Sequence, residues 1–589
     1  MTKKLLASVM AFALCQFMLA TDMIVKQKNG EIKKFNVENV EEVIFNENSN
    51  IPNDSTVVDA SETFLLFKIL SDSTAKVIIE KFNSKTSYLG HDSITIPEKV
   101  RIKGKVYTVT EIGESAFWGC SSLTNINIPE SVTNIEKNAF AFCNSLTDIE
   151  IPEGVTSIGI WAFYGCSSLE SINIPEGVTY IGEYAFHDCN RLEPKLLIYD
   201  KGTKCYGWVG NKKKCTKVVI PESVTSIGRA AFTECYNLTS ISIPEGVTSI
   251  GANAFFNCES MSSIEIPKVI TNIEEFVFVS CSSLTSINIP EGVTSIGEGA
   301  FSGCSSLTNI DIPEGVTSIG KLAFYHCNSL DPKILVYDKG TKCYGWVGDN
   351  KKCTEVVIPE GVTSIGEDAF YFCTNLTSIE MPNGVTSIGA GAFEVCSSLA
   401  SIDIPDGVTS IEAYAFMDCD SLKNINIPEG VSNIGESAFR GCSNLANIDI
   451  PEGVTSIGVS AFRGCISLTN INIPEGVTSI GEYAFYDCNS LDPKILVYDK
   501  GTKCYGWVGD REKCTNIVIP EGVTSIGRYA FYECSSLTRI NIPESVTLIW
   551  PYAFAECKKL DIVIDNSRNK VSSWESSFNN CKSVTWLKE

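Results

Sequence analysis

The sequence predicts a β-rich solenoid in which one short unit is stacked about 21 times behind a small β-rich N-terminal cap. Cysteine recurs every 23 residues, as at Cys120, Cys143, Cys166 and Cys189. The 589-residue chain is also 44% hydrophobic, which is ample for a packed interior. No unit of this length can enclose its own apolar side chains, whereas stacked identical units bury all of them.

The first 20 residues have the pattern of an export signal. Lys3 and Lys4 precede an apolar run from Leu5 to Ala20, and charged, alternating sequence follows. The run is too short for a membrane span, and no second hydrophobic segment occurs. We therefore expect residues 1–20 to be a signal peptide. The mature protein is expected to be secreted or at the cell surface, without a transmembrane segment.

Residues 21–111 do not share the repeat. Within residues 21–58, Asn29-Gly30 between alternating residues predicts a β-hairpin, and a polar linker follows it. Residues 59–111 contain further strand-like runs, such as Phe64–Leu70. We expect this segment to be the N-terminal cap, because the open end of a solenoid would otherwise expose apolar surface.

The solenoid is expected over residues 112–589. In a typical unit, Leu169–Ile174 places apolar side chains at strand spacing, and Pro175 ends that strand because it cannot donate to a ladder. Val178–Ile181 starts a second extended piece. Ala185 and Phe186 then supply a large apolar plug on a short helical turn. We expect stacked ladders of leucine, isoleucine, valine, phenylalanine and cysteine.

Three cysteine intervals are twice as long as the others, so each hides one divergent repeat, near residues 190–220, 328–358 and 489–519. The register puts Cys353 at the core leucine position and Trp346 close to the phenylalanine plug, which favours a repacked core. Two alternatives remain open. The repeats could hold the disulfides Cys205–Cys215, Cys343–Cys353 and Cys504–Cys514, or form aromatic binding knobs at Trp208, Trp346 and Trp507.

The tandem motif resembles a known family. The segment Ile289–Cys304, Ile-Pro-Glu-Gly-Val-Thr-Ser-Ile-Gly-Glu-Gly-Ala-Phe-Ser-Gly-Cys, is similar to the treponemal-type leucine-rich repeat of BspA-like bacterial surface proteins. The resemblance implies a leucine-rich-repeat solenoid on a secreted or surface-exposed protein, often linked to adhesion to host matrix proteins or other microbes. Gly177 stands where the commonest leucine-rich repeats carry asparagine, so we expect no asparagine ladder.

Composition narrows the possible functions. A net charge of −23 and a pI near 4.7 disfavour nucleic acid and anionic lipid as partners. Only three histidines occur, and no catalytic, phosphate-binding or calcium-binding motif is present. We expect no enzymatic activity, no cofactor and no metal site. The ladder cysteines are interpreted as buried free thiols, and His187 and His326 as surface turn positions.

The most favoured function is protein binding through the outward residues of the first strand. These positions form a polar, acidic and repetitive face, namely Asn173, Asn288, Asp311, Asp403, Asn426, Asp449, Asn472 and Asn541. Expected partners are proteins, such as host extracellular-matrix proteins or other microbial surface proteins. The alternative is a structural spacer or scaffold with no ligand of its own.

Overall fold

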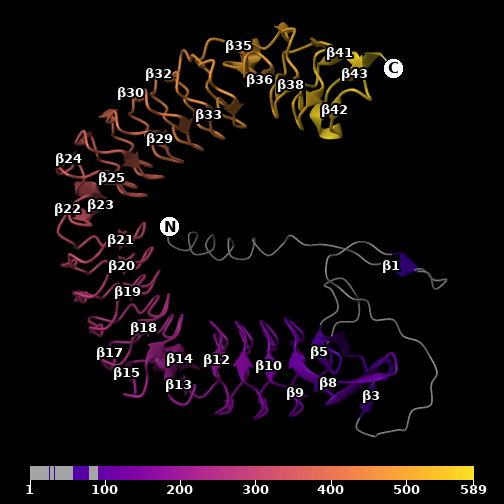
Figure 1. The fold of residues 1–589 in the computed structure, drawn as a ribbon, viewed down its shortest axis with the longest axis vertical. Coiled ribbons are helices and arrows are strands. Elements are labelled where there is room, and N and C mark those ends of the chain that lie inside the picture. Colours follow the sequence, from indigo (N-terminus) through magenta and orange to yellow (C-terminus); the bar gives the residue numbers. More distant parts are fainter. Residues whose placement is uncertain (1–24, 27–31, 34–56, 79–89, 589) are drawn as a thin grey trace.

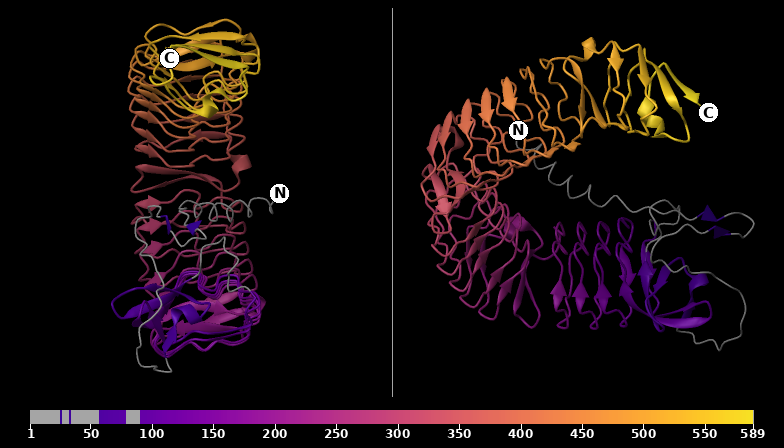
Figure 2. Two further views of the ribbon diagram at one scale, coloured as in Figure 1. Left: turned by 90° about the vertical axis from the view of Figure 1, so that its right-hand side faces the viewer. Right: turned by 45° about the horizontal axis from the view of Figure 1, so that its top comes forward.

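The computed structural model describes residues 57–78 and 90–588, together with two short strands near the N-terminus. These strands, β1 (Val25–Lys26) and β2 (Ile32–Lys33), pair antiparallel, as a hairpin around Asn29-Gly30 requires. The expected signal peptide lies outside the described residues. The coils of the solenoid stack one on the next into an open arc (Figure 1), which the further views also show (Figure 2). The predicted solenoid fold is confirmed.

One short parallel strand per coil lies on the inner side of the arc (Figure 1). Its isoleucine is buried and the residue before it faces solvent, in register with residues 23 positions away, as in Ser295↔Ser318. The inner strands are β10 (Asn134–Ile135), β11 (Ser157–Ile158), β12 (Tyr180–Ile181), β16 (Ser226–Ile227), β18 (Ser249–Ile250), β19 (Asn272–Ile273), β20 (Ser295–Ile296), β21 (Ser318–Ile319), β25 (Ser364–Ile365), β27 (Ser387–Ile388), β29 (Ser410–Ile411), β31 (Asn433–Ile434), β33 (Ser456–Ile457), β34 (Ser479–Ile480), β38 (Ser525–Ile526), β40 (Leu548–Ile549) and β42 (Ser572–Ser573).

A second row of parallel strands lies on the outer side of the arc (Figure 1). It is less continuous, and several coils share only an isolated bridge such as Glu265↔Asn288. The curvature of the arc explains this difference, because the coils are farther apart on its outer side than on its inner side. The outer strands are β6 (Ser93–Thr95), β9 (Asn125–Asn127), β15 (Lys217–Val219), β17 (Ser240–Ser242), β24 (Glu355–Val357), β26 (Ser378–Glu380), β28 (Ser401–Asp403), β30 (Asn424–Asn426), β32 (Asn447–Asp449), β37 (Ile517–Val518), β39 (Arg539–Ile542), β41 (Asp561–Ser567) and β43 (Ser583–Lys588).

The segment that carries the phenylalanine is a series of tight turns. In one coil, Asn138 (φ 56°) and Phe142 (φ 63°) adopt left-handed conformations, which prevent a continuous helix. Phe140 N–H donates to the carbonyl of Ala162 in the next coil at 2.7 Å, so the turns also stack through backbone hydrogen bonds. The described helical elements are short 3₁₀ turns, namely η1 (Ala60–Glu62), η2 (Lys212–Lys214), η3 (Asn350–Lys352), η4 (Arg511–Lys513) and η5 (Glu575–Phe578).

A column of stacked phenylalanine rings forms the centre of the core. The rings of Phe278 and Phe301 are fully buried, with centroids 5.4 Å apart. In most coils the ladder cysteine beside the ring donates its thiol to the preceding coil, as Cys304 Sγ does to the carbonyl of Phe278 at 3.2 Å. Burial raises the pKa of Cys304 to about 12, so this thiol stays protonated.

A threonine ladder runs beside the inner strands. The hydroxyl of Thr156 donates to the carbonyl of Thr133, and that of Thr179 donates to the carbonyl of Thr156, at 3.3 and 3.4 Å. The same bond recurs every 23 residues through most of the solenoid, as from Thr478 to Thr455. These side chains satisfy strand carbonyls where an asparagine ladder does so in other leucine-rich repeats.

Each divergent repeat is an antiparallel hairpin inserted in the stack. Its second strand joins the inner strands, so that Cys343 pairs with Ile365 in parallel register. The core is thereby divided into four clusters of buried side chains, with boundaries at the three hairpins. The hairpin strands are β13 (Lys195–Tyr199) with β14 (Lys204–Val209), β22 (Lys333–Tyr337) with β23 (Lys342–Val347), and β35 (Lys494–Tyr498) with β36 (Lys503–Val508).

Glycine is required where the hairpin touches the following coil. Gly345 has φ +121°, and a Cβ there would lie 1.8 Å from the carbonyl oxygen of Ala369. Gly207 and Gly506 occupy the same place in the other two hairpins, with the same clash. Any side chain at these positions would push the hairpin away from the stack.

A mixed sheet closes the N-terminal end of the solenoid. Its strands are β3 (Val57–Asp59), β4 (Leu66–Ile69), β5 (Thr74–Ile78), β7 (Lys99–Ile102) and β8 (Lys105–Ile112). Strand β8 pairs in parallel with the first inner strand, β10, and antiparallel with β7. The row of inner strands therefore continues into the cap without an exposed edge at this junction.

We predict that replacing one core phenylalanine damages the solenoid locally. Phe301→Ala leaves a cavity between two stacked rings and should cost about 3–5 kcal/mol. Each coil contacts only its neighbours, so hydrogen exchange should accelerate around residues 278–324 and remain unchanged in distant coils. Equal loss of protection throughout the chain would contradict the proposed local coupling.

Candidate functional site

The predicted binding residues lie in one row on the outer side of the arc. In β28 the Ile402 side chain is buried, whereas Ser401 and Asp403 on either side of it are exposed. The alternation follows from the pleat of a strand with one buried face. All eight predicted residues are exposed, namely Asn173, Asn288, Asp311, Asp403, Asn426, Asp449, Asn472 and Asn541.

Neighbouring members of the row lie in direct register. Asp403 pairs with Asn426, which pairs with Asp449. Coils on paired strands are roughly 4.8 Å apart, so the amide separates two carboxylates by about twice that distance. This alternation weakens the repulsion between aligned like charges. The row therefore offers carboxylate and amide oxygens at a regular spacing.

Three further carboxylates belong to the same row and were not predicted. Glu150 bridges to Asn173 and Glu265 bridges to Asn288, both in parallel register. Glu380, at the end of β26, holds the equivalent position one coil before Asp403. All three are exposed. The sequence pattern could have identified them, because each glutamate stands two residues before the proline that ends its strand, in the segment Ile-Glu-Ile-Pro or Ile-Glu-Met-Pro.

Exposed valines interrupt this polar row after each hairpin. Val219, Val357 and Val518 hold the outward position in the first ordinary coil and are 74%, 63% and 82% exposed. These three isolated apolar residues divide the outer face into polar stretches. Each valine directly follows a hairpin and therefore lies near a boundary between two core clusters.

A tyrosine continues the phenylalanine column into each hairpin. The buried ring of Tyr344 packs edge-on against Phe324 at 5.5 Å, and its hydroxyl oxygen accepts from Phe324 N–H at 3.0 Å. Tyr206 and Tyr505 repeat this arrangement. The sequence register placed Trp346 close to the plug, but the edge-on contact is made two residues earlier because the hairpin strand runs past the plug.

The three tryptophans are half-buried beside these tyrosines. Their indole N–H groups donate within the hairpin, from Trp208 to the carbonyl of Asn211, from Trp346 to that of Asp349, and from Trp507 to that of Asp510. Their polar atoms are therefore satisfied without a ligand. What remains available to a partner is part of the ring surface.

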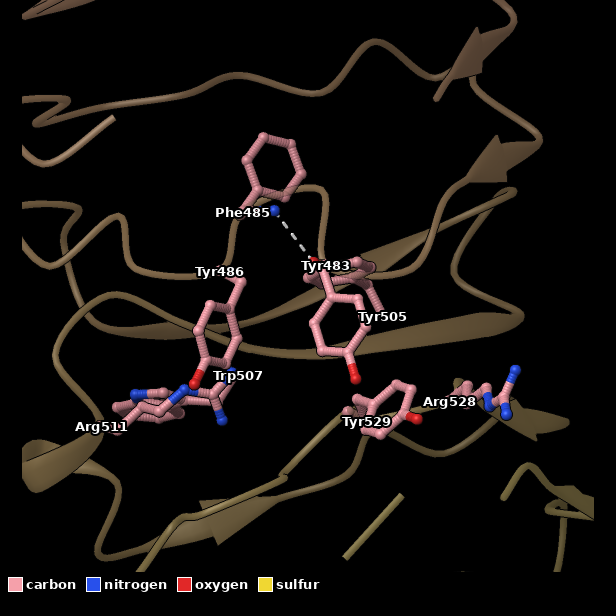
Figure 3. Close-up of a pocket in the computed structure, with 9 residues that line it drawn as sticks. Tyr483, Phe485, Tyr486, Tyr505, Trp507, Arg511, Arg528 and Tyr529 are labelled. Atoms are coloured by element: carbon pink, nitrogen blue, oxygen red, sulfur yellow. Dashed lines mark hydrogen bonds between the residues drawn. The ribbon is translucent and has the colours of Figure 1, made fainter. Parts of the chain in front are cut away.

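Trp507 lines a shallow aromatic pocket at the third hairpin (Figure 3). The guanidinium of Arg511 lies 4.8 Å above the ring of Tyr486, and that of Arg528 lies 5.3 Å above Tyr529. Arg528 also pairs with Glu482 at 3.1 Å. The pocket is a shallow depression between these rings, so it could contact one side chain or one ring of a larger partner.

The second hairpin has a similar but more acidic pocket, lined by Trp346, Tyr325 and Asp368 among others. Burial raises the pKa of Asp368 to about 6, helped by the neighbouring charge of Glu367. In the described residues there is no group of three or more His, Cys, Asp or Glu side chains that could hold a metal ion.

The first hairpin carries a charged cluster at the equivalent place. His187 was expected on the surface, but its side chain is only 11% exposed and lies 3.4 Å from both Asp188 Oδ2 and Glu234 Oε2. Its ring stacks on Tyr164 at 5.5 Å. Burial lowers the pKa of His187, but the two carboxylates outweigh burial and raise it above the ordinary value.

No disulfide joins any two of the described cysteines in this structure. In each hairpin pair predicted as a possible disulfide, the two cysteines lie on different sides of the coil. Cys205, for example, is on the inner strand β14, whereas Cys215 occupies the leucine position at the start of the outer side. The thiol of Cys215 instead faces Cys235 in the next coil. Cys353 and Cys373 face one another in the same way.

Stacked coils, two rows of parallel strands and a fully buried leucine before most of the outer strands define a leucine-rich-repeat solenoid. The chain belongs to the BspA type Leucine rich repeat region family, whose model matches in six copies. The matched residues are 91–201, 209–331, 348–448, 432–496 and 508–588. This repeat family and solenoid fold are typically non-catalytic and suggest protein binding.

Solved structures of bacterial proteins are similar to this chain. A leucine-rich repeat protein from Bacteroides ovatus is 30% identical, with 72% of this chain and 91% of that one covered and a TM-score of 0.33. A leucine rich cell surface protein from Faecalibacterium prausnitzii is 29% identical, with 76% and 94% covered and a TM-score of 0.34. A Treponema pallidum leucine-rich repeat protein is 25% identical over 42% of this chain and 89% of that one, with a TM-score of 0.21. No curated protein matches the chain.

We predict that the first hairpin junction weakens as pH rises. Because the folded pKa of His187 is raised, its stabilising contribution is complete below the unfolded value of about 6.5. The contribution is lost as pH increases through the folded pKa. Hydrogen exchange of residues 183–235, compared between wild type and His187→Tyr, should show this pH dependence in the wild type alone. Tyr486 provides the same side chain in the third junction, so the substitution is compatible with the fold. Identical pH profiles would contradict the prediction.

Proposed function

We propose that this chain is an exported binding protein that presents its polar, acidic outer face to a protein partner. The observation that carries the proposal is the exposed row of carboxylate and amide side chains in register from coil to coil, as in Asp403, Asn426 and Asp449. The net charge of −23 favours a basic protein surface as the partner. Host extracellular-matrix proteins and surface proteins of other microbes are the partner classes we propose.

Repetition compensates for weak individual contacts in this proposal. A single exposed ion pair contributes little, about 0–1 kcal/mol. A row of equivalent groups held on one scaffold binds a long partner at many points, so that each later contact forms at high effective concentration. The relation to cell-surface proteins supports the location, because one of the similar structures is described as a leucine rich cell surface protein.

A second candidate binding site is the set of hairpin pockets. The observation in its favour is that Trp346 and Trp507 line the second and third pockets, beside further aromatic rings. Such pockets fit an aromatic or aliphatic side chain of a partner. If neither the row nor the pockets bind, the chain acts as a spacer that separates other modules.

We predict that removing charge from the row weakens binding and leaves the fold intact. The full mature chain and the variant Asp311→Asn/Asp403→Asn/Asp449→Asn should be compared on a panel of immobilised matrix and microbial surface proteins. Association with a basic partner should be slower in the variant and less sensitive to salt, because electrostatic attraction acts mainly on the association rate. Stability should change by less than about 0.5 kcal/mol per site, because all three carboxylates are exposed.

The matched control removes three charges from the neighbouring turn with Glu291→Gln, Glu429→Gln and Glu452→Gln, which are also exposed. Binding to this control should stay close to the wild-type level. If Trp346→Ala and Trp507→Ala abolish binding in folded protein while the aspartate variant binds normally, the pockets are the site. If no variant changes binding, the row has no recognition role.

We also predict that the mature chain begins at Thr21. The apolar segment after Lys3 and Lys4 motivates this expectation, and N-terminal sequencing of the exported protein tests it. Within the described residues no helix is long and apolar enough to cross a membrane. An intact Met1, or a lipid attached to Cys15, would show a different route to the surface.

A further inference from the structure

The ladder cysteines differ in one respect at the hairpins. In ordinary coils the thiol donates to the carbonyl of the phenylalanine in the preceding coil, as Cys258 does to Phe232 at 3.2 Å. A coil that follows a hairpin has no phenylalanine turn beneath it. Within residues 90–588, Cys235, Cys373 and Cys534 form no thiol-to-carbonyl hydrogen bond, unlike the ladder cysteines of the coils that follow them.

A second cysteine takes the place of the missing acceptor in each case. Cys215 stands 23 residues before Leu238 and therefore at the leucine position of the hairpin coil. In the next coil, Cys235 and Leu238 belong to one tight turn, in which Leu238 N–H donates to the carbonyl of Cys235 at 2.9 Å. The strands around the pair are held together, since Thr239 N–H donates to the carbonyl of Thr216 at 2.8 Å. The two thiols interact across the coils, and both side chains are completely buried.

The same arrangement recurs at the other two hairpins. The thiol of Cys373 contacts Cys353, and the thiol of Cys514 contacts Cys534. Each pair is separated by 20 positions along the chain and is at most 1% exposed. In a solenoid with 24 described cysteines, such a pair occurs at each of the three coils that follow a hairpin.

We propose that Cys215–Cys235, Cys353–Cys373 and Cys514–Cys534 are three disulfide bonds of the exported protein. This inference rests on the proposed export, because oxidising compartments allow disulfides to persist. For each bond, two thiols lose two protons and two electrons. A protein or small-molecule disulfide accepts both electrons by thiol–disulfide exchange and leaves as two thiols.

The alternative pairing within a hairpin does not share this geometry. Cys205 lies on the inner strand β14, opposite Ile227, and its thiol interacts with the backbone of Gly207. Cys215 lies at the leucine position that begins the outer side of the coil and contacts Cys235 instead. Because one sulfur forms one disulfide, the pairs Cys205–Cys215 and Cys215–Cys235 exclude each other.

The proposed bonds strengthen the coil contacts where ring stacking is interrupted. The column of phenylalanines ends at Phe186, where the Tyr206 ring packs edge-on at 5.7 Å, and parallel stacking resumes with Phe232 and Phe255. A covalent link between Cys215 and Cys235 ties the hairpin to the first coil of the next cluster. It supplies a constraint where the packing of aromatic rings is weakest.

Peptide mapping distinguishes the possible pairings. The full chain is exported to an oxidising bacterial periplasm, free thiols are blocked at harvest, and trypsin is used without reduction. Lys214 and Lys217 flank Cys215, so Cys205, Cys215 and Cys235 fall on separate peptides, residues 205–212, 215–217 and 230–268. We expect peptide 215–217 to be linked to 230–268. Linkage to 205–212, or three blocked thiols, would overturn the proposal.

A parallel sample refolded with oxidised and reduced glutathione separates this inference from export. If the chain is not exported but the pairing is right, the glutathione sample still contains the bonds. If neither sample contains them, the pairing is wrong whatever the location of the protein.

Three variants complete the test. Cys235→Ser should abolish the link to peptide 215–217, whereas Cys205→Ser and Cys258→Ser should preserve it. In oxidised protein, hydrogen exchange across residues 190–235 should be about 100-fold slower than in Cys235→Ser, the factor expected for closing a loop of this size. Reducing agent should remove that difference. Equal exchange in oxidised wild type and Cys235→Ser would show that no bond constrains this junction.

Discussion

The contact between one coil and the next is the interaction on which this molecule depends. A coil of 23 residues has no interior of its own, so its isoleucines, leucine, phenylalanine and cysteine are buried only by its neighbours. Parallel strand pairing on two sides and the stacked phenylalanine turns on the third fix the same register throughout. The regular exposed rows of side chains follow directly from this register, because any outward position recurs at the coil spacing.

Much of this architecture could be predicted from periodicity alone. The number of coils, the place of the hairpins, the burial of Phe301 and the exposure of Asp403 follow from a repeat in which every unit must bury the same positions. The curvature could not be predicted, because it depends on small differences in coil spacing between the inner and outer strands. The sequence therefore gave no indication that the polar row lies on the outer side of an arc.

The details at the hairpins were also beyond sequence reasoning. Tyr344 and Trp346 are both large, aromatic and close to the expected plug position, and only the path of the hairpin strand decides which ring meets Phe324. The burial of the His187 side chain depends on its contact with Glu234, which lies two coils further along the chain. Likewise, the spacing of Cys205 and Cys215 suggests a local pair, whereas stacking brings Cys215 to a residue of the next coil.

The division of the core into four clusters has a mechanical consequence. In the adhesive role that we propose, the chain would be pulled along its length, and we expect a solenoid with one uninterrupted core to unravel from its end coil by coil. Here the aromatic stacking is broken at three hairpins, which also hold buried cysteine pairs. Under tension each cluster can therefore yield as a separate block, and the extension of the chain proceeds in a few large steps that dissipate force.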